Sequence, residues 1–201
     1  MKIIVGLGNP GEKYLKTRHN CGEFYLGKLR NAWSSQPEAG PPGAEKYFFK
    51  ESKHALWADM KIGGIKTYLI FPTEMMNNSG TSLKKALTEL KLKPKPADIL
   101  VIHDDLDIEL GKIKLSFARS SAGHKGVESV IKNLKSDKFW RLRIGISPKK
   151  KPDHKKILDL LLKRFKPEEE KILNKNSKRI IEGLEIWLSN PQKAMTAINS
   201  N

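Results

Sequence analysis

The chain of 201 residues contains a single cysteine, Cys21, so it cannot form an internal disulfide. That count is compatible with a reducing compartment. No apolar run approaches the roughly 20 residues that a membrane-spanning helix needs, and the N-terminus has a strand pattern instead of a signal peptide. The sequence therefore predicts a soluble, cytoplasmic protein with no membrane partner.

Acidic residues are also scarce. The chain has 22 Asp and Glu against 38 Lys and Arg, which gives a formal net charge of +16. Most of the excess lies in residues 111–164, which hold 16 basic and 4 acidic residues. A concentrated basic surface attracts polyanions, and nucleic acid is the commonest such partner of a cytoplasmic protein. A surface that only improves solubility is the alternative, because charge alone identifies no substrate.

Length and pattern predict a single α/β domain over residues 1–201, since two domains would need a longer chain. Enrichment in β-branched and aromatic residues predicts strands at 2–6, 54–60, 65–71, 98–103, 112–117 and 140–146. Helices are predicted at 22–33, 79–91, 124–135 and 168–188, and exposed loops at 34–45, 91–98 and 148–156. Strand–helix–strand crossovers give parallel pairs, and Gly63-Gly64 indicates a hairpin turn. We therefore expect a mixed, twisted β-sheet flanked by α-helices.

The N-terminal segment is the most informative part of the sequence. A strand pattern over residues 3–5 ends in the glycine turn GLGNPG, and His19 follows. A G-x-G-x-x-G turn after a strand suggests a dinucleotide site, but Pro10 removes a backbone N–H that a bound pyrophosphate would need. A nucleotide-dependent oxidoreductase is therefore disfavoured. The turn instead predicts a loop that brings together the amide of Asn9 and the imidazole of His19.

His19 can serve as a general base, because an imidazole with a pKa of about 6.5 is largely neutral at pH 7. A carboxylate on its other ring nitrogen would fix the tautomer and stabilise the imidazolium. Asp104, Asp105 and Asp107 follow the predicted strand 98–103 and are the candidates. Chemistry alone does not separate these three carboxylates.

The other histidines are weaker candidates. His103 precedes Asp104 on a predicted buried strand, and His124 begins a predicted helix. His54 and His154 have no group of catalytic residues around them in the sequence.

Six blocks of sequence resemble a known family in the family's own order. Residues 6–22, GLGNPGEKYLKTRHNCG, are similar to the N-terminal signature of bacterial-type peptidyl-tRNA hydrolases. The other five blocks are PTEMMNNSG (72–80), HDDLD (103–107), GKIK (111–114), GHKG (123–126) and RLRIGI (141–146). The resemblance implies a monomeric enzyme without cofactor or metal that hydrolyses the ester of peptidyl-tRNA. Stalled large ribosomal subunits would be a further partner of its basic surface.

The resemblance also implies roles for particular residues. His19 would be the general base and Asp104 the carboxylate that orients it. Asn9 would help to distinguish a blocked amino group from a free one, and Asn77 would hold the 3′ end of the substrate.

Three side chains, Tyr14, Met75 and Met76, would line the same pocket on this resemblance. Plain core filling is the alternative for the two methionines.

Lys114 and Arg143 match family positions that clamp the tRNA backbone. The compact charge of a lysine ammonium and the planar guanidinium of an arginine together suit a phosphate. A solvated strand face is the alternative, and Arg141 could serve instead because it alternates with Arg143 on the same face.

Lys125 is the clearest departure from the family. It stands where the family usually has asparagine in Gly-Gly-His-Asn-Gly, and residues 119–122 replace a glycine-rich approach. A lysine can donate to an oxyanion or a phosphate but cannot accept a hydrogen bond. We assign Lys125 to substrate binding, and its presence makes a non-catalytic RNA-binding relative the alternative function.

Overall fold

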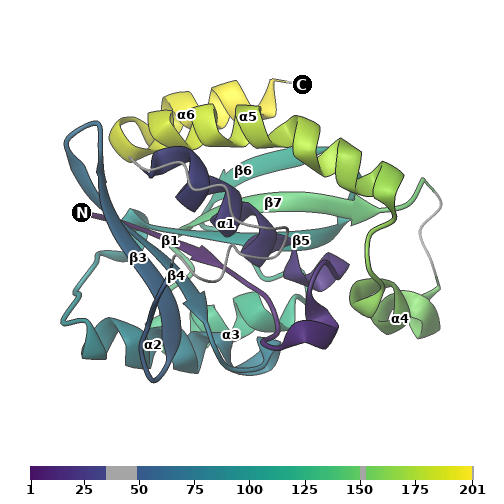
Figure 1. The fold of residues 1–201 in the computed structure, drawn as a ribbon, viewed down its shortest axis with the longest axis horizontal. Coiled ribbons are helices and arrows are strands. Elements are labelled where there is room, and N and C mark those ends of the chain that lie inside the picture. The colour runs from purple at the N-terminus through teal and green to yellow at the C-terminus, as the bar shows by residue number, and fades with distance from the viewer. Residues whose placement is uncertain (35–48, 150–152, 201) are drawn as a thin grey trace.

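The computed structural model describes residues 1–34, 49–149 and 153–200. These residues form a seven-stranded sheet with the order β2-β3-β4-β1-β5-β7-β6 (Figure 1). The strands are β1 (Lys2–Gly6), β2 (Lys50–Glu51), β3 (Ala55–Ile62), β4 (Ile65–Pro72), β5 (Ile99–Glu109), β6 (Ile113–Phe117) and β7 (Trp140–Ser147). β1 pairs in parallel with β4 and β5, and β5 does so with β7, whereas the other pairs are antiparallel. The predicted mixed sheet is confirmed.

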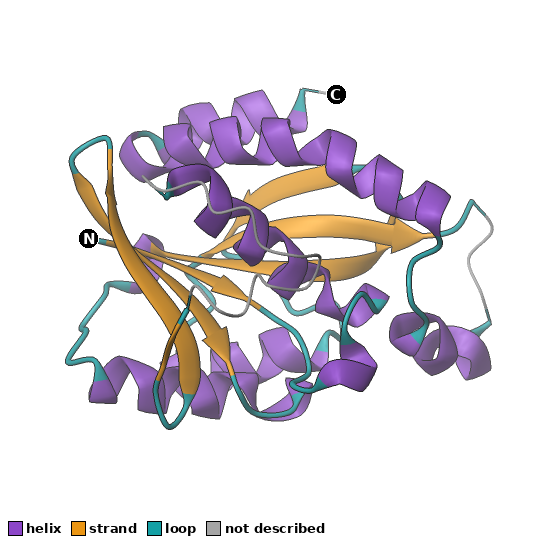
Figure 2. Cartoon of the chain, viewed as in Figure 1, coloured by secondary structure: helices purple, strands orange, loops and turns teal. Residues whose placement is uncertain are grey.

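Helices cover both faces of this sheet (Figure 2). They are α1 (Cys21–Trp33), α2 (Ser79–Glu89), α3 (Lys125–Leu134), α4 (Ile157–Leu162), α5 (Pro167–Ser189) and α6 (Pro191–Asn199). α1, α5 and α6 pack on one face, and α2 and α3 pack on the other. α4 lies beside the short 3-10 helix η2 (Arg18–Asn20). Within the described ranges, no helix combines the length and the apolar character needed to cross a membrane.

β1 lies in the middle of the sheet and is buried on both faces. Ile4 packs into the core beneath α1 and α5, while Ile3 and Val5 pack beneath α2 and α3. A strand covered on both faces needs a continuous apolar run, which residues 3–5 supply. The chain leaves β1 at the C-terminal edge of the parallel strands, so the glycine turn and η2 lie at that edge.

Two glycines permit the close packing that assembles this edge. A Cβ atom on Gly22, near the start of α1, would lie 2.4 Å from the carbonyl oxygen of Ile102. A Cβ atom on Gly126, near the start of α3, would lie 2.4 Å from the sulfur of Met76. Both helices therefore begin closer to their neighbours than a larger residue would allow.

The Gly63-Gly64 hairpin is confirmed, with positive φ at both residues between β3 and β4. The largest difference between a predicted and an observed boundary is in β5. The strand predicted at 98–103 continues to Glu109, so Asp104 lies within β5 and not at its end. Residues 104–109 lack a strand pattern, but β7 pairs with both ends of this stretch, with Asp104 opposite Ile144 and Glu109 opposite Ser147 across a register shift.

Three of these strands and α-helices were not predicted, namely β2, α4 and α6. β2 and α4 have 2 and 6 residues, too few to display a periodic pattern. α6 begins where the Asn190 side chain accepts a hydrogen bond from the Lys193 N–H and so caps a new helix. Of the predicted loops, residues 35–45 and 150–152 lie outside the described residues, and 91–98 ends in a 3-10 turn.

Candidate active site

The catalytic candidates meet at the C-terminal edge of the parallel strands. η2 places His19 so that its Nδ1 lies 2.8 Å from Oδ1 of Asp104 on β5. His19 is 9% exposed and Asp104 is 2% exposed. The contact between them is therefore shielded from water, while part of His19 remains accessible to solvent. The predicted His19–Asp104 pair is therefore brought together.

His124 contacts the same carboxylate oxygen. Its Nε2 lies 2.9 Å from Asp104 Oδ1, and its Nδ1 accepts the Val127 N–H at 3.3 Å as the N-cap of α3. Because Nδ1 accepts, the proton of a neutral imidazole resides on Nε2 and is donated to Asp104. Sequence reasoning ranked His124 as weak. The sequence signal that could have made His124 a stronger candidate is its place at the N-cap of a predicted helix.

The close contacts in this cluster shift the pKa of Asp104 and of His19 in opposite directions. Burial works to raise the pKa of Asp104, but His19 and His124 together lower it well below its usual range. Burial works to lower the pKa of His19, but the charge and hydrogen bond of Asp104 raise it above the ordinary value. Asp104 therefore remains ionised beside His19 throughout the physiological range.

His103 supports the cluster from within β5. Its Nδ1 lies 2.7 Å from the carbonyl oxygen of Asp104, and its ring stands edge-on to the His124 ring at 4.8 Å. Burial lowers the pKa of His103 to about 3. It is therefore a neutral packing partner and not a second base.

Asp105 and Asp107 do not contact His19. Asp105 Oδ2 accepts the Arg143 Nε–H at 2.7 Å, and Asp105 Oδ1 accepts the Asp107 backbone N–H at 2.8 Å. Successive side chains of a strand point to opposite faces, which separates Asp104 from Asp105. Of the three carboxylates, Asp104 is the one in position to orient the imidazole.

Asn9 is held in the glycine turn from two sides. The side chain of Asn20 accepts the Asn9 N–H at 2.9 Å and donates to its carbonyl oxygen at 2.8 Å. The Met76 N–H donates to Asn9 Oδ1 at 2.8 Å. This last bond fixes the orientation of the Asn9 side-chain amide, so that Asn9 Nδ2 points away from the Met76 N–H. Sequence reasoning did not single out Asn20, although it adjoins His19.

The predicted pocket residues fall into two groups. Met76 is buried in the core beside Leu7 and Val127, which agrees with core filling for its side chain. Met75 is 42% exposed, and Asn77 in η4 (Met76–Asn78) is exposed, with no side-chain hydrogen bond among the described residues.

Tyr14 ends the 3-10 helix η1 (Glu12–Tyr14), shortly before η2, and is half-buried. Lys13 Nζ lies over its ring at 4.9 Å. The Tyr14 carbonyl oxygen accepts a hydrogen bond from the Thr17 hydroxyl at 2.7 Å, and this bond stabilises the turn before His19.

The basic candidates lie outside the Asp104 cluster. Lys114 and Arg143 stand opposite each other across β6 and β7, and Lys114 is exposed. The Lys125 side chain is 72% exposed, and its Nζ lies 3.4 Å from Glu128 Oε2 on α3. Lys125 thus lies along the helix surface.

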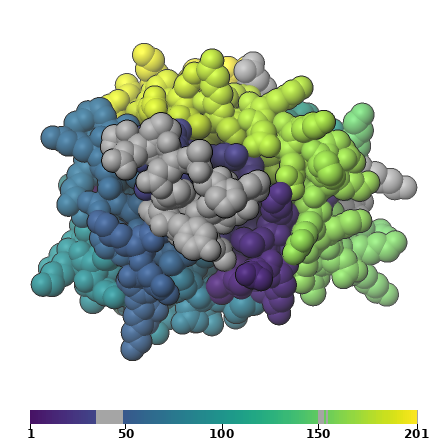
Figure 3. Space-filling model, viewed as in Figure 1, coloured from purple at the N-terminus to yellow at the C-terminus, as the bar shows by residue number. Residues whose placement is uncertain are grey.

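Arg18 fastens η2 to the segment between α4 and α5. Its Nη1 donates to the carbonyl oxygen of Arg164 at 3.0 Å, and its Nη2 lies 2.5 Å from Glu169 Oε1. Thr17 and Arg164 also form an isolated antiparallel bridge. In Figure 3 the purple N-terminal segment adjoins green C-terminal residues on the surface. The position of His19 therefore depends on contacts across about three quarters of the chain, which no sequence pattern indicated.

The ligand atoms of His19, Asp104 and His124 all lie within 4.8 Å of one another, a spacing that a metal ion could use. Coordination through His124 Nε2 would move its proton to Nδ1, where it would face the Val127 N–H donor. The histidine tautomer therefore fits a hydrogen-bonded cluster and does not fit an ion site.

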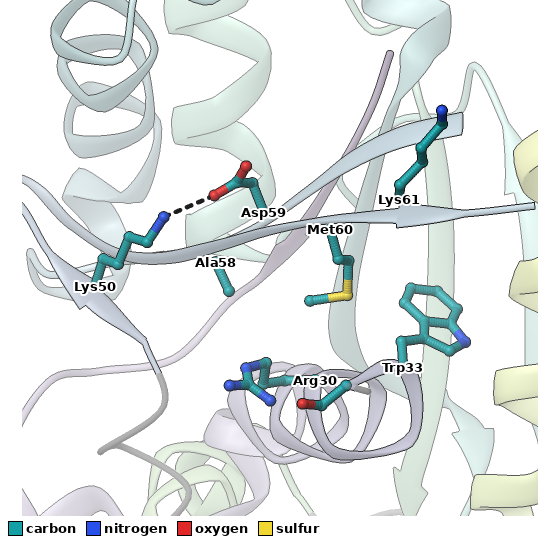
Figure 4. A pocket seen from close by; sticks show the side chains of 8 residues that line it. Arg30, Trp33, Lys50, Ala58, Asp59, Met60 and Lys61 are labelled. Carbon is teal, nitrogen blue, oxygen red and sulfur yellow. Dashed lines mark hydrogen bonds and ion pairs between the residues drawn. The ribbon is translucent and has the colours of Figure 1, made fainter. Parts of the chain in front are cut away.

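A hollow of about 370 Å³ lies at the other end of α1 from η2, between Arg30 and Trp33 and the strand β3 (Figure 4). Lys50 and Asp59 on its rim form an ion pair at 2.9 Å. α1 has 13 residues, a length of about 20 Å, so this hollow is remote from His19.

Comparison with known proteins gives concordant results. Residues 3–201 match the family model described as peptidyl-tRNA hydrolase. The peptidyl-tRNA hydrolase of Aquifex aeolicus is 40% identical over 201 residues, covering 99% of this chain and 96% of that protein. The Bacillus thuringiensis protein of the same name is 35% identical and is covered completely. A crystal structure of peptidyl-tRNA hydrolase from Acinetobacter baumannii has a TM-score of 0.85 at 26% identity, covering 100% of this chain and 95% of that one.

Proposed function

The chain belongs to the peptidyl-tRNA hydrolase family and is an enzyme that hydrolyses peptidyl-tRNA, and on that premise we propose that His19 activates the attacking water. The observation that carries this proposal is the 2.8 Å contact between His19 Nδ1 and Asp104. With Nδ1–H donated to the carboxylate, Nε2 has a free lone pair that can accept a proton.

In the proposed reaction, water attacks the carbonyl carbon of the ester as its proton passes to His19 Nε2. The imidazolium so formed is stabilised by Asp104, and it returns the proton to the departing 3′ oxygen of the tRNA. His124 holds Asp104 from the other side, so the carboxylate does not rotate away from His19 as charge develops. The proton is thus recycled within one turnover.

Substrate contacts are assigned to the groups around this pair. Asn9 Nδ2 is a donor that can orient the peptide carbonyl or the oxyanion, because its Oδ1 already binds the Met76 N–H. The exposed amide of Asn77 would hold the 3′ end, with Tyr14 and Met75 on the pocket walls. The Met76 side chain fills the core, and its contribution is the N–H that positions Asn9.

Phosphate contacts are assigned to Lys114 and Arg143 on β6 and β7, with Lys125 on the rim of the site. Asp105 binds the Nε of Arg143, which leaves both terminal nitrogens as possible donors to a phosphate. We further propose that the protein is a cytoplasmic monomer, and that its basic surface also meets stalled large ribosomal subunits.

The test compares a peptidyl-tRNA with the matching free aminoacyl-tRNA, and we expect cleavage of the first alone. His19→Ala should lower the single-turnover rate by about 10²- to 10⁴-fold while tRNA affinity is kept. His54→Ala is the matched control, because His54 lines a separate hollow on α2. Near-normal turnover of His19→Ala would remove His19 from the mechanism.

A further inference from the structure

Arg18 directly precedes His19 in the chain and is itself a buried charge. The Arg18 side chain is 6% exposed, and its Nη2 lies 2.5 Å from Oε1 of Glu169 in the first turn of α5. The Arg18 guanidinium also lies over the Phe165 ring at 5.0 Å. A buried cation needs a counterion, because water no longer stabilises its charge. Glu169 supplies that counterion.

Glu169 is held through both of its carboxylate oxygens. Its Oε1 binds Arg18, and its Oε2 accepts the Lys166 backbone N–H at 2.8 Å. The second bond belongs to the capping box that begins α5. One turn further along this helix, Leu173 is buried in the core beneath α1 and α5. The carboxylate that binds Arg18 is therefore fixed to a long helix packed on the sheet.

The backbone on the N-terminal side of His19 is bound to the residues that precede α5. The Arg18 N–H donates to the carbonyl oxygen of Lys163 at 3.1 Å, and the Phe165 N–H donates to that of Lys16 at 3.0 Å. Phe165 is buried and belongs to the core beneath α1 and α5. The segment before α5 is thus anchored in the core, and it supports the loop that leads to His19.

The contacts on the other side of His19 do not replace this support. Asn20 binds the backbone of Asn9, and the His19 ring binds Asp104. η2 is a single turn of 3-10 helix, which gains little stability of its own. Without Glu169 the charge of Arg18 would be buried and unpaired. Arg18 would relieve that cost by turning toward water, which would displace the adjacent backbone of His19.

A second ion pair joins the same two segments at the surface. Lys16 Nζ lies 3.3 Å from Glu170 Oε2, and the Lys16 side chain is 59% exposed. Exposed ion pairs contribute little, because water and salt screen them. Glu170 is therefore a matched control for Glu169. It carries the same charge in the same turn of α5, but its cation is not buried.

We propose that Glu169 is a positioning residue for the hydrolysis of peptidyl-tRNA, and that it acts through Arg18 to hold His19 against Asp104. Arg18 and Glu169 are 151 positions apart in the chain. A small displacement of a reacting group is costly, because proton transfer requires close alignment. The expected effect on the rate rests on the proposed role of His19 as the base, whereas the position of His19 can be observed without hydrolysis.

The first experiment measures kcat and KM on peptidyl-tRNA for Arg18→Met, Glu169→Ala and the double variant. Each single variant should lower kcat by about 10- to 100-fold and change KM by less than about twofold, since the basic residues of β6 and β7 are untouched. Glu170→Ala should keep both constants.

The double variant shows whether Glu169 acts through Arg18. In the Arg18→Met background, Glu169→Ala should lower kcat no further, although it still removes the cap of α5. An equal loss of kcat in both backgrounds, or an unchanged kcat in Glu169→Ala alone, would overturn the proposal.

Glu169→Gln guards against misfolding of Glu169→Ala. A glutamine can keep the capping box, so this variant removes the counterion and leaves the start of α5 intact. We expect kcat to fall by about 5- to 20-fold with KM unchanged. Thermal unfolding checks that the variant is folded at the temperature of the assay. An unchanged kcat would contradict the proposal.

Proton NMR observes the position of His19 directly. An imidazole proton bound to a buried carboxylate resonates far downfield, and the His19 signal is identified by its absence in His19→Ala. Glu169→Gln should lose this signal or shift it upfield, and Glu170→Ala should keep it. An unchanged His19 signal in Glu169→Gln would refute the positioning role. If His19→Ala kept its hydrolysis while Glu169→Gln lost the signal, the positioning of His19 would stand and its role as the base would fall.

Discussion

Two groups of polar side chains, one around Asp104 of β5 and one on β6 and β7, are built in opposite ways. In the Asp104 cluster, His19 and His124 both bind one carboxylate oxygen; His19 and Asp104 are buried, and the His124 side chain is 8% exposed. On the face of β6 and β7, Lys114 is exposed and Arg141 is buried, with no hydrogen-bond partner for its guanidinium among the described residues. The first group is held in place by contacts within the chain, as proton transfer requires. The second presents donors whose partners the described chain does not supply, as anion binding requires.

The largest expected effect separates the two neighbouring carboxylates. Asp104→Asn removes the negative charge that stabilises the His19 imidazolium and replaces one carboxylate oxygen by a donor, so kcat should fall by about 10²-fold or more. Asp105→Asn breaks the Arg143 pair on the other side of the strand and should change kcat by less than about tenfold. Steady-state kinetics on peptidyl-tRNA measures both. A larger loss in Asp105→Asn would mean that the wrong carboxylate is assigned.

The second prediction concerns the pH dependence of the buried cluster. In His124→Asn the shorter side chain can still cap α3 but does not reach Asp104. Asp104 then loses one donor and attracts the His19 proton more strongly, which raises the pKa of His19 further. Because the base must be neutral to act, the acidic limb of kcat/KM should move to higher pH. A limb that stays in place or moves to lower pH would contradict a role for His124.

Two other ionisable groups near this cluster have strongly shifted pKa values. Burial lowers the pKa of His103 to about 3, and burial together with the charge of Asp104 raises the pKa of the Cys21 thiol well above its ordinary value. Asp105 is bound to Arg143. His54→Asn, outside the cluster, should leave the limb unchanged and is the control.

The third prediction concerns Lys114, the exposed basic residue on β6. Lys114→Ala should weaken the binding of different tRNAs about equally and lower the slope of log affinity against log salt by about 0.7–0.9. Lys178→Ala, on the outer surface of α5, is a control of similar charge. An unchanged slope in Lys114→Ala would mean that Lys114 is only part of a solvated strand face.

The smallest effect is expected at Lys125. Its side chain pairs with Glu128 and is largely in water, so its charge is well screened from His19. Lys125→Asn should keep hydrolysis or raise it by at most about twofold, with the larger gain at lower pH. Initial rates across a pH series decide this. Loss of activity in Lys125→Asn would mean that the chain uses the lysine as a donor to substrate.

Local patterns predicted much of the fold. The strand before the glycine turn, the Gly63-Gly64 hairpin and the helix predicted at 124–135 all depend on residues within a few positions of one another. β2 and α4 were too short to leave such a pattern.

The sequence by itself determined the elements and the types of group available for chemistry, because helix caps, turns and strand alternation are set by near neighbours. Only the tertiary structure decided which groups meet. His19 and Asp104 are 85 positions apart, and the pairing of β5 with β7 together with the packing of η2 turns Asp104 toward His19 and Asp105 toward Arg143. The same packing placed His124 on Asp104 and buried Arg141, whose guanidinium has no hydrogen-bond partner in the described part of the chain. Contacts of this kind depend on register and close packing over the whole chain, which a local pattern does not encode.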